Sequence, residues 1–345
     1  LAFGRLAALD LTCSVVPLVV GIVAAALGAG YWALVAQQVF SGALMVVLLM
    51  WSCRWLPGAY DRGQPVAPIV RVGSSFFLGA LLGYVMRNAD AVVVGRRFGA
   101  DALGLYNRSV QLVRTPLSQI QGPFGSVTLP VLAAARDDDE RLVRATRRAQ
   151  LAFIYPVLAG VAWLVAAASD VVRLTLGTGW IDAAPVMAWI AVAGGAGCVG
   201  YAAVWVLAAR GLAARMNAFN ILAAVLVLAG VLLGSRGGVE GVAAGVAIAT
   251  ALGWPLGLAT LAWGGYLPVG ALAWAAVRAS ATATLAGLAG WQALARIDPG
   301  PALVRAVLAL VVVAAVMAAA ATLPSVRRDY REVLGMLRML RTKQV

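Results

Sequence analysis

The sequence predicts an all-α polytopic membrane protein, and three observations support this fold class. Hydrophobic residues make up 62% of the 345 residues and charged residues only 12%, whereas soluble domains are roughly 45–50% apolar and about 25% charged. The mean hydropathy is +0.90. Apolar stretches long enough to cross a bilayer, which takes about 20 residues, recur along the whole chain. So little charge cannot cover so much apolar surface in water, and we expect lipid to be the solvent.

About ten stretches are expected to form transmembrane helices. In chain order they are 6–27, 31–53, 73–95, 103–134, 149–169, 183–209, 216–234, 239–263, 271–292 and 303–323. The fourth stretch contains Pro116, Pro123 and Pro130, and proline interrupts the helical hydrogen bonds, so we expect kinks or a break there. Asp138 or Asp139 is expected to cap the helix that follows.

The tail beyond the last stretch has the pattern of an amphipathic helix. Apolar side chains recur at helical spacing with arginines between them: Tyr330, Val333, Leu334, Leu337 and Leu340. Such a helix binds the surface of an anionic membrane. We therefore expect the tail to be a surface anchor, with a partner-binding helix as the alternative.

The positive charge predicts an orientation. The net charge is +13, which by itself would suit nucleic acid. Most of the arginines instead lie in alternate connections between apolar stretches, as cytoplasmic loops do, so no nucleic-acid partner is expected. The excess of arginine in cytoplasmic loops of membrane proteins predicts that both ends of this chain face the cytoplasm. The chain opens on Leu1 and runs directly into an apolar stretch, so we expect that it is a piece whose amino-terminal part precedes it.

Several kinds of chemistry are excluded by residue content. The chain has no histidine, and its three cysteines lie singly within or beside apolar stretches. The sequence also has no phosphate-binding loop of the Walker type. We therefore expect no catalytic residues, no metal and no cofactor, which means that the protein is not an enzyme.

Polar residues inside the apolar stretches are the candidates for function, because charge within a bilayer is costly unless it has a partner or lines a cavity. Arg87 and Asp90 lie three positions apart and share a helix face. They form either a structural ion pair that locks helix packing or part of a cavity lining. Arg278 and Arg305 lie near helix ends and are expected to extend to the interface.

The fourth stretch carries a polar stripe. Arg108, Gln111, Thr115 and Ser118 follow spacings of three and four, and Arg114 widens the stripe. Lipid would not tolerate such a face, so it meets protein or water. Arginine offers paired donors that suit an anionic ligand such as phosphate, although Arg108 alone could extend to the outer interface. We predict a substrate-binding cavity formed by these residues: Arg87, Asp90, Arg108, Gln111, Arg114 and Ser118.

One stretch resembles a known family. The segment Asn88-Ala-Asp-Ala-Val-Val-Val-Gly is followed by a glycine-rich turn that ends in Gly-Leu-Tyr, and its characteristic residues are Asp90, Gly95, Gly99, Gly104 and Tyr106. Together with Leu129-Pro-Val-Leu-Ala and Gly30-Tyr-Trp-Ala-Leu-Val-Ala, it is similar to the lipopolysaccharide or exopolysaccharide flippase branch of the multidrug/oligosaccharidyl-lipid/polysaccharide exporter superfamily.

The resemblance implies an organisation. Such flippases have two six-helix lobes and often two extra helices, so the ten helices here would be the fifth to the fourteenth. The implied divisions are 1–60, the end of an incomplete first lobe with two helices; 61–72, a cytoplasmic linker; 73–265, a complete second lobe; 266–324, two additional helices; and 325–345, a basic amphipathic cytoplasmic tail.

The resemblance also implies a function. The protein would move undecaprenyl-pyrophosphate-linked oligosaccharides across the bacterial inner membrane by alternating access, for lipopolysaccharide or exopolysaccharide synthesis. Its partners would be the anionic lipid-linked oligosaccharide, membrane lipids, and possible neighbours such as a polysaccharide polymerase and glycosyltransferases. Arginines 87, 108 and 114 would attract the pyrophosphate, and Asp90 would hold Arg87 or couple transport to an ion gradient.

Two other functions stay open. An ion-coupled multidrug or metabolite exporter of the same superfamily would need an acidic cavity, and the excess of arginine in the third and fourth stretches argues against it. A non-transporting scaffold of a polysaccharide synthesis complex would use the same arginines for packing alone.

Overall fold

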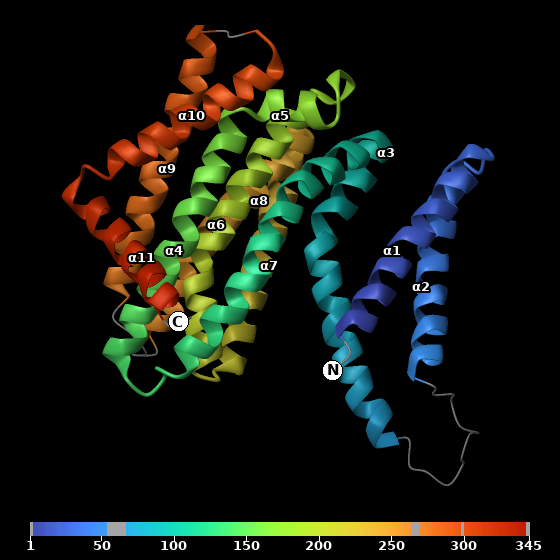
Figure 1. Ribbon diagram of the computed structural model, residues 1–345, viewed down its shortest axis with the longest axis horizontal. Helices are drawn as coiled ribbons and strands as arrows, with labels where there is room; N and C mark the ends of the chain where they lie inside the picture. Colours follow the sequence, from blue (N-terminus) through green and yellow to red (C-terminus); the bar gives the residue numbers. More distant parts are fainter. Residues whose placement is uncertain (1–2, 54–66, 264–268, 298–299, 343–345) are drawn as a thin grey trace. The chain divides into compact units, whose positions relative to one another are not determined.

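The computed structural model describes residues 3–53, 67–263, 269–297 and 300–342, and nearly all of them lie in helices or in the turns between helices (Figure 1). Within these ranges the side chains of 3–8, 10, 53, 67–83, 85–87 and 334–342 are outside the description. The chain divides into two compact units, 1–75 and 76–345. The all-α fold class predicted from the sequence is confirmed.

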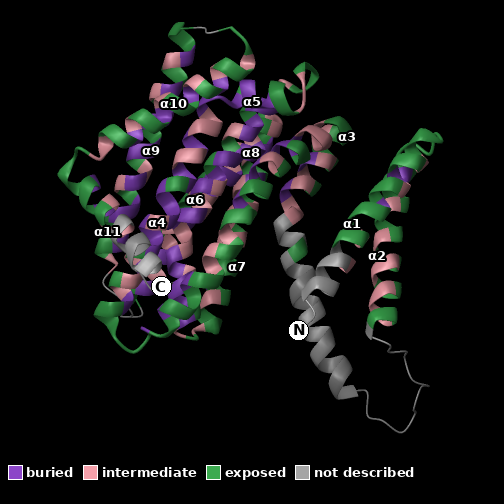
Figure 2. Ribbon diagram, viewed as in Figure 1, coloured by how far each residue is buried: buried purple, intermediate pink, exposed green. Residues whose placement is uncertain are grey.

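The first unit contains a helical hairpin. Helix α1 (Phe3–Ala26) and helix α2 (Trp32–Cys53) are joined by a turn in which Gly28 and Gly30 have positive φ angles. The Ser41 hydroxyl donates to the carbonyl oxygen of Cys13 at 3.3 Å and links the two helices. Most described side chains of this hairpin are exposed although they are apolar (Figure 2), which requires lipid or protein around them.

Helix α3 (Ala67–Ala133) folds back on itself at Gly99. This residue has φ 89° and ψ −177°, a conformation open mainly to glycine, and it separates two helical limbs. A straight helix would place Asp90 and Arg114 about 36 Å apart at 1.5 Å per residue, yet their side chains are 3.6 Å apart. The predicted stretches 73–95 and 103–134 are these limbs. The expected break at the prolines is wrong, because the helical backbone continues through them.

Helices α4 (Asp139–Ala166) and α6 (Ala183–Ala209) form the centre of the second unit, where buried residues concentrate (Figure 2). Asp138 caps α4, as expected, by accepting a hydrogen bond from the backbone N–H of Arg141 at 2.9 Å. Along the chain, the short helix α5 (Ala168–Thr175) lies between α4 and α6, and it was not predicted from the sequence. Phe124 stacks on Trp205 and lies against Phe153 in a tilted arrangement, so the second limb of α3 packs against this centre.

Helix α7 (Ala213–Gly234) and helix α8 (Gly238–Trp263) pack closely because glycines line their contact. A Cβ atom at Gly230 would overlap the backbone of Gly245, and one at Gly234 would overlap the backbone of Gly241. Small residues allow this approach between membrane helices. The pair packs on α6, which contacts α8 along much of its length.

Helices α9 (Gly270–Ile297) and α10 (Ala302–Ala320) pack against α4, and helix α11 (Pro324–Thr342) follows (Figure 1). Val326 and Asp329 of α11 are buried against the protein. The Tyr330 ring packs on Tyr155 of α4 with 4.9 Å between ring centroids. Burial raises the pKa of the Tyr330 hydroxyl, and the neighbouring Asp329 raises it further.

The tail forms the predicted helix, its first half packs on the bundle, and its place on the membrane surface stays a prediction. This half docks on the bundle, because it presents Asp329 to arginines of α4 and α9. The side chains of Leu334, Leu337 and Leu340, on which the rest of the prediction depends, lie outside the described residues.

Six described stretches are long and apolar enough to cross a membrane: Trp32–Ser52, Asp139–Ala166, Ala183–Ala209, Ala213–Trp263, Gly270–Ile297 and Ala302–Ala320. The fourth of these contains both α7 and α8, and Leu11–Ala26 in α1 is a shorter apolar helix. The protein is thus a polytopic membrane protein. The predicted number of about ten spans stays a prediction. The division into lobes also stays a prediction, and much of the linker 61–72 lies outside the described residues.

Candidate functional site

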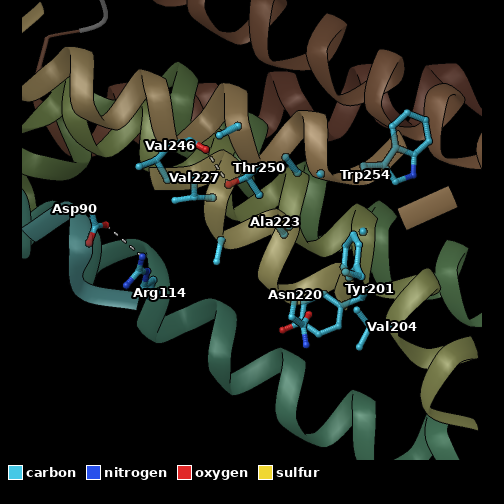
Figure 3. A pocket seen from close by; sticks show the side chains of 17 residues that line it. Asp90, Arg114, Tyr201, Val204, Asn220, Ala223, Val227, Val246, Thr250 and Trp254 are labelled. Atoms are coloured by element: carbon cyan, nitrogen blue, oxygen red, sulfur yellow. Dashed lines mark hydrogen bonds and ion pairs between the residues drawn. The ribbon is translucent and has the colours of Figure 1, made fainter. Parts of the chain in front are cut away.

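A cavity of about 580 Å³ lies among four helices of the second unit (Figure 3). Asp90 and Arg114 come from the two limbs of α3, and the rest of the lining comes from α6, α7 and α8. These last three contribute small and apolar residues together with a few polar and aromatic ones, chiefly Tyr201, Asn220, Thr250 and Trp254. Ligand sites commonly combine apolar walls with a small number of placed polar groups.

Asp90 is a buried carboxylate with partners from both limbs of α3. Its Oδ2 accepts a hydrogen bond from the Tyr106 hydroxyl at 2.8 Å and lies 3.6 Å from an Nη atom of Arg114. Its Oδ1 accepts the backbone N–H of Ala91 at 2.9 Å. The Asp90 side chain is 7% exposed and that of Arg114 is 53% exposed. The guanidinium therefore stays open to the cavity while it balances the buried charge.

The bend at Gly99 positions this ion pair. Leu103 packs next to Gly95 across the bend, so the limbs lie close together. Beyond the bend, Ser109 donates to the carbonyl oxygen of Ala183 at 3.2 Å, which joins the second limb to the start of α6. The Gln121 amide donates a hydrogen bond to the Cys198 sulfur and accepts one from the Tyr201 hydroxyl, both on α6 and both at 3.3 Å. The second limb is thus held on α6 at two points, Ser109 and Gln121.

The wall formed by α6, α7 and α8 supplies neutral groups. Asn220 is exposed into the cavity, and Thr250 donates its hydroxyl proton to the carbonyl oxygen of Val246 at 2.8 Å. The indole N–H of Trp254 is buried and has no hydrogen-bond partner among the described residues. The Asn220 amide, by contrast, is available to a polar neutral ligand.

The structure brings together only part of the predicted site. Arg108 donates to Gln111 at 3.0 Å and Ser118 donates to the carbonyl oxygen of Thr115 at 2.8 Å, all on the exposed face of α3 and outside the cavity lining. The expected partner of Asp90 was Arg87, whereas the described partners are Tyr106 and Arg114, which the fold-back at Gly99 brings within reach. The side chain of Arg87 lies outside the described residues.

Sequence reasoning missed the residues of the opposite wall. Tyr201, Thr250 and Trp254 lie in apolar stretches where such residues are common in packing. A signal existed for Asn220 alone, because an amide within a long apolar helix is unusual.

Two arginines expected to extend to the interface have buried carboxylate partners that the sequence did not predict. Arg278 pairs with Asp329 at 2.8 Å, and Arg305 pairs with Asp170 at 3.0 Å. The pairing could not be predicted because both carboxylates lie far away in the sequence. In the described part of the chain, no group of three histidine, cysteine or acidic residues is placed to hold a metal ion.

These features define a polytopic helical membrane protein with a mainly apolar cavity among its helices that contains an ion pair and a few polar groups. The family model described as "Polysaccharide biosynthesis protein" matches residues 1–185, more than half of the chain. The chain belongs to this family of polysaccharide biosynthesis proteins.

The chain is also similar to the teichuronic acid biosynthesis protein TuaB of Bacillus subtilis (strain 168). The two are 25% identical over 154 residues, which cover 43% of this chain and 31% of that protein. The chain therefore spans less than a third of that relative's length in the match. No solved structure matches the chain.

Proposed function

We propose that this protein moves lipid-linked oligosaccharide units across the bacterial inner membrane for surface polysaccharide synthesis. The observation that carries the proposal is the cavity within the helical bundle, which combines one open guanidinium with neutral hydrogen-bonding and aromatic groups. Membership of a polysaccharide biosynthesis family and the similarity to a teichuronic acid biosynthesis protein support a sugar-containing substrate.

Each part of the cavity has a role in this proposal. Arg114 attracts the pyrophosphate or acidic sugars, because guanidinium offers paired donors to such oxygens. The Asn220 amide bonds sugar hydroxyl groups. Asp90 holds Arg114 in place and is a candidate for coupling to an ion gradient. The exposed stripe from Arg108 through Gln111 to Ser118 extends the polar surface beyond the cavity.

Transport by alternating access needs no covalent chemistry, so the proposed protein is not an enzyme. The substrate would be an undecaprenyl-pyrophosphate-linked unit, delivered by glycosyltransferases and taken up by a polymerase. Both ends of this chain would face the cytoplasm, in keeping with the distribution of arginine.

The test is replacement of Arg114 in the full-length protein, followed by measurement of surface polysaccharide. Arg114→Ala should lower surface polysaccharide at least about tenfold, because a lost charge-assisted contact to phosphate is worth roughly 1.5–3 kcal/mol, and Arg114→Lys should retain part of it. Arg173→Ala is the matched control, because Arg173 is exposed on α5 and does not line the cavity.

Membrane levels of each variant are measured in parallel. Normal polysaccharide from a normally expressed Arg114→Ala protein would contradict the site and favour the scaffold function. Resistance to organic cations that depends on this protein would favour the drug exporter, although the open arginine in the cavity does not suit cationic substrates.

A further inference from the structure

A second polar pocket lies where α4, α9 and α11 come together. Its volume is about 420 Å³, and its lining includes Arg147 from α4, Trp274 and Arg278 from α9, and Ser325 and Arg328 from α11. It shares no residue with the cavity among α3, α6, α7 and α8. We call it the α11 pocket.

Two of its arginines form ion pairs with one buried carboxylate, Asp329. Asp329 is fully buried and accepts Arg278 through Nε and one terminal nitrogen at 2.8–3.0 Å. Arg147 uses one terminal nitrogen to contact Asp329 at 3.2 Å and Glu332 at 3.3 Å. The Tyr155 hydroxyl donates a further hydrogen bond to Asp329 at 3.2 Å. These contacts fix the guanidinium groups before any ligand arrives.

Donors remain after these contacts are made. The Nε–H of Arg147 is buried and has no hydrogen-bond partner among the described residues. Arg328 is exposed at the pocket and has no ion pair within the described part of the chain. Three guanidinium groups face two carboxylates, Asp329 and Glu332, so the pocket keeps a net positive charge.

The aromatic residues place the α11 pocket at the level of lipid headgroups. Trp274 is 62% exposed, and the guanidinium carbon of Arg278 lies 6.0 Å from the centroid of its ring. Exposed tryptophan concentrates at the boundary between headgroups and acyl chains. Trp263, at the end of α8, is 85% exposed and lies shortly before α9 in the chain. Arg147 follows the arginine-rich connection that the sequence assigns to the cytoplasmic face, where anionic lipids attract basic clusters.

We propose that the α11 pocket binds the phosphate headgroup of an anionic phospholipid, with Arg147, Arg278 and Arg328 as its ligands. Guanidinium groups match the geometry of phosphate oxygens, and fixed ones lose little freedom on binding. The early residues of α11, Ser325 among them, add the favourable dipole of a helix start. Such a lipid ties α11 to α4 and α9. The proposal concerns a separate site and holds whether or not the cavity transports oligosaccharide.

Native mass spectrometry of the full-length protein in detergent tests the proposal by counting bound phosphatidylglycerol as its concentration rises. Arg328→Gln removes one ligand without touching the Asp329 contacts, and it should weaken phosphatidylglycerol binding about fivefold. Arg331→Gln is the matched control, since Arg331 is exposed on the same helix and does not line the pocket. Unchanged binding in Arg328→Gln, or an equal loss in both variants, overturns the proposal.

Two further arms identify the source of the phosphate. Phosphatidylcholine should bind more weakly than phosphatidylglycerol, and inorganic phosphate should displace phosphatidylglycerol only at far higher concentration. Equal binding of both lipids, or displacement by inorganic phosphate at lipid-like concentration, overturns the assignment to an anionic lipid. The unfolding temperature without added lipid must be the same in Arg328→Gln and wild type, and phosphatidylglycerol must raise it more in the wild type; an equal rise in both overturns the site.

Discussion

At the scale of single residues, Asp90 is the most consequential side chain of the cavity. It is almost fully buried, and an isolated buried carboxylate is strongly unfavourable. Two side-chain contacts compensate it, a hydrogen bond from Tyr106 and an ion pair with Arg114 that is half exposed. The first stabilises the fold, whereas the second leaves a positive group accessible to a ligand. Structure and candidate function therefore depend on the same carboxylate.

Replacement of Tyr106 by phenylalanine tests the structural half of this arrangement. Tyr106→Phe leaves Asp90 Oδ2 with one donor fewer in a buried place, so we expect a loss of about 1–3 kcal/mol in the free energy of unfolding. Thermal unfolding in detergent measures it. Tyr84→Phe is the control, because Tyr84 is 61% exposed and precedes Asp90 on the same limb. Equal unfolding temperatures for the two variants would contradict the role of Tyr106.

At the scale of elements, the bend in α3 decides which residues can meet. Gly99 has a φ angle of 89°, where a side chain is strained. We predict that Gly99→Ala lowers the unfolding free energy by about 1–3 kcal/mol. Gly104→Ala, on the second limb, should be neutral or slightly stabilising, because a Cβ there meets open space. Denaturant or thermal unfolding compares them, and two variants of equal stability would refute the strain at Gly99.

The contact between α7 and α8 makes a separate prediction. Gly245→Ala places a methyl group against the backbone of Gly230, so the helices must move apart. We expect a destabilisation of about 1–3 kcal/mol, as for overpacked cores. Gly253→Ala on the same helix meets no atom within 4 Å and serves as the control in thermal unfolding. A stable Gly245→Ala protein would mean that the helices are not in close contact.

At the scale of the whole second unit, buried ion pairs tie the last helices to the bundle. Asp170 of α5 pairs with Arg305 at the start of α10. Asp329 of α11 pairs with Arg147 and Arg278. Removing one partner of a buried pair is costly because the other charge is left uncompensated. We therefore regard Asp329 as the residue that docks α11.

Asp329→Asn tests this docking. The change leaves Arg278 without a carboxylate partner and Arg147 with Glu332 alone, and we expect a loss of about 3–5 kcal/mol in stability. Arg327 and Arg328 are exposed but lie in a folded helix, and trypsin should cleave after them faster once α11 detaches and its backbone can unfold. Asp137→Asn is the control, because Asp137 is 91% exposed. Cleavage at the wild-type rate would show that α11 is held by its apolar contacts instead.

The helices were largely predictable because their signal is local. An apolar stretch of sufficient length specifies a membrane helix wherever its neighbours lie, and the start of α4 was marked by Asp138. The three prolines misled because a helix tolerates proline when surrounding helices satisfy the freed backbone groups. The short helix α5 was missed because it is too short to span a membrane.

The candidate site was predictable only in part. Asp90 and Arg114 were recognised as polar residues in apolar surroundings, but Tyr201 and Trp254 carry no such signal. The ion pairs of Arg278 and Arg305 were missed because their partners, Asp329 and Asp170, lie 51 and 135 positions away. No local pattern reports a contact of that kind.

The sequence by itself determined that this protein lies in a membrane, where its helices lie along the chain, and which few charges need an explanation. Composition and the length of apolar stretches are properties of segments, so they can be read without knowing the fold. Only the tertiary structure decided that Asp90 meets Arg114, that α6, α7 and α8 complete the cavity, and that α11 docks through Asp329. Each of these depends on a bend or a distant pairing, and the energy of such contacts exists only once the helices are packed.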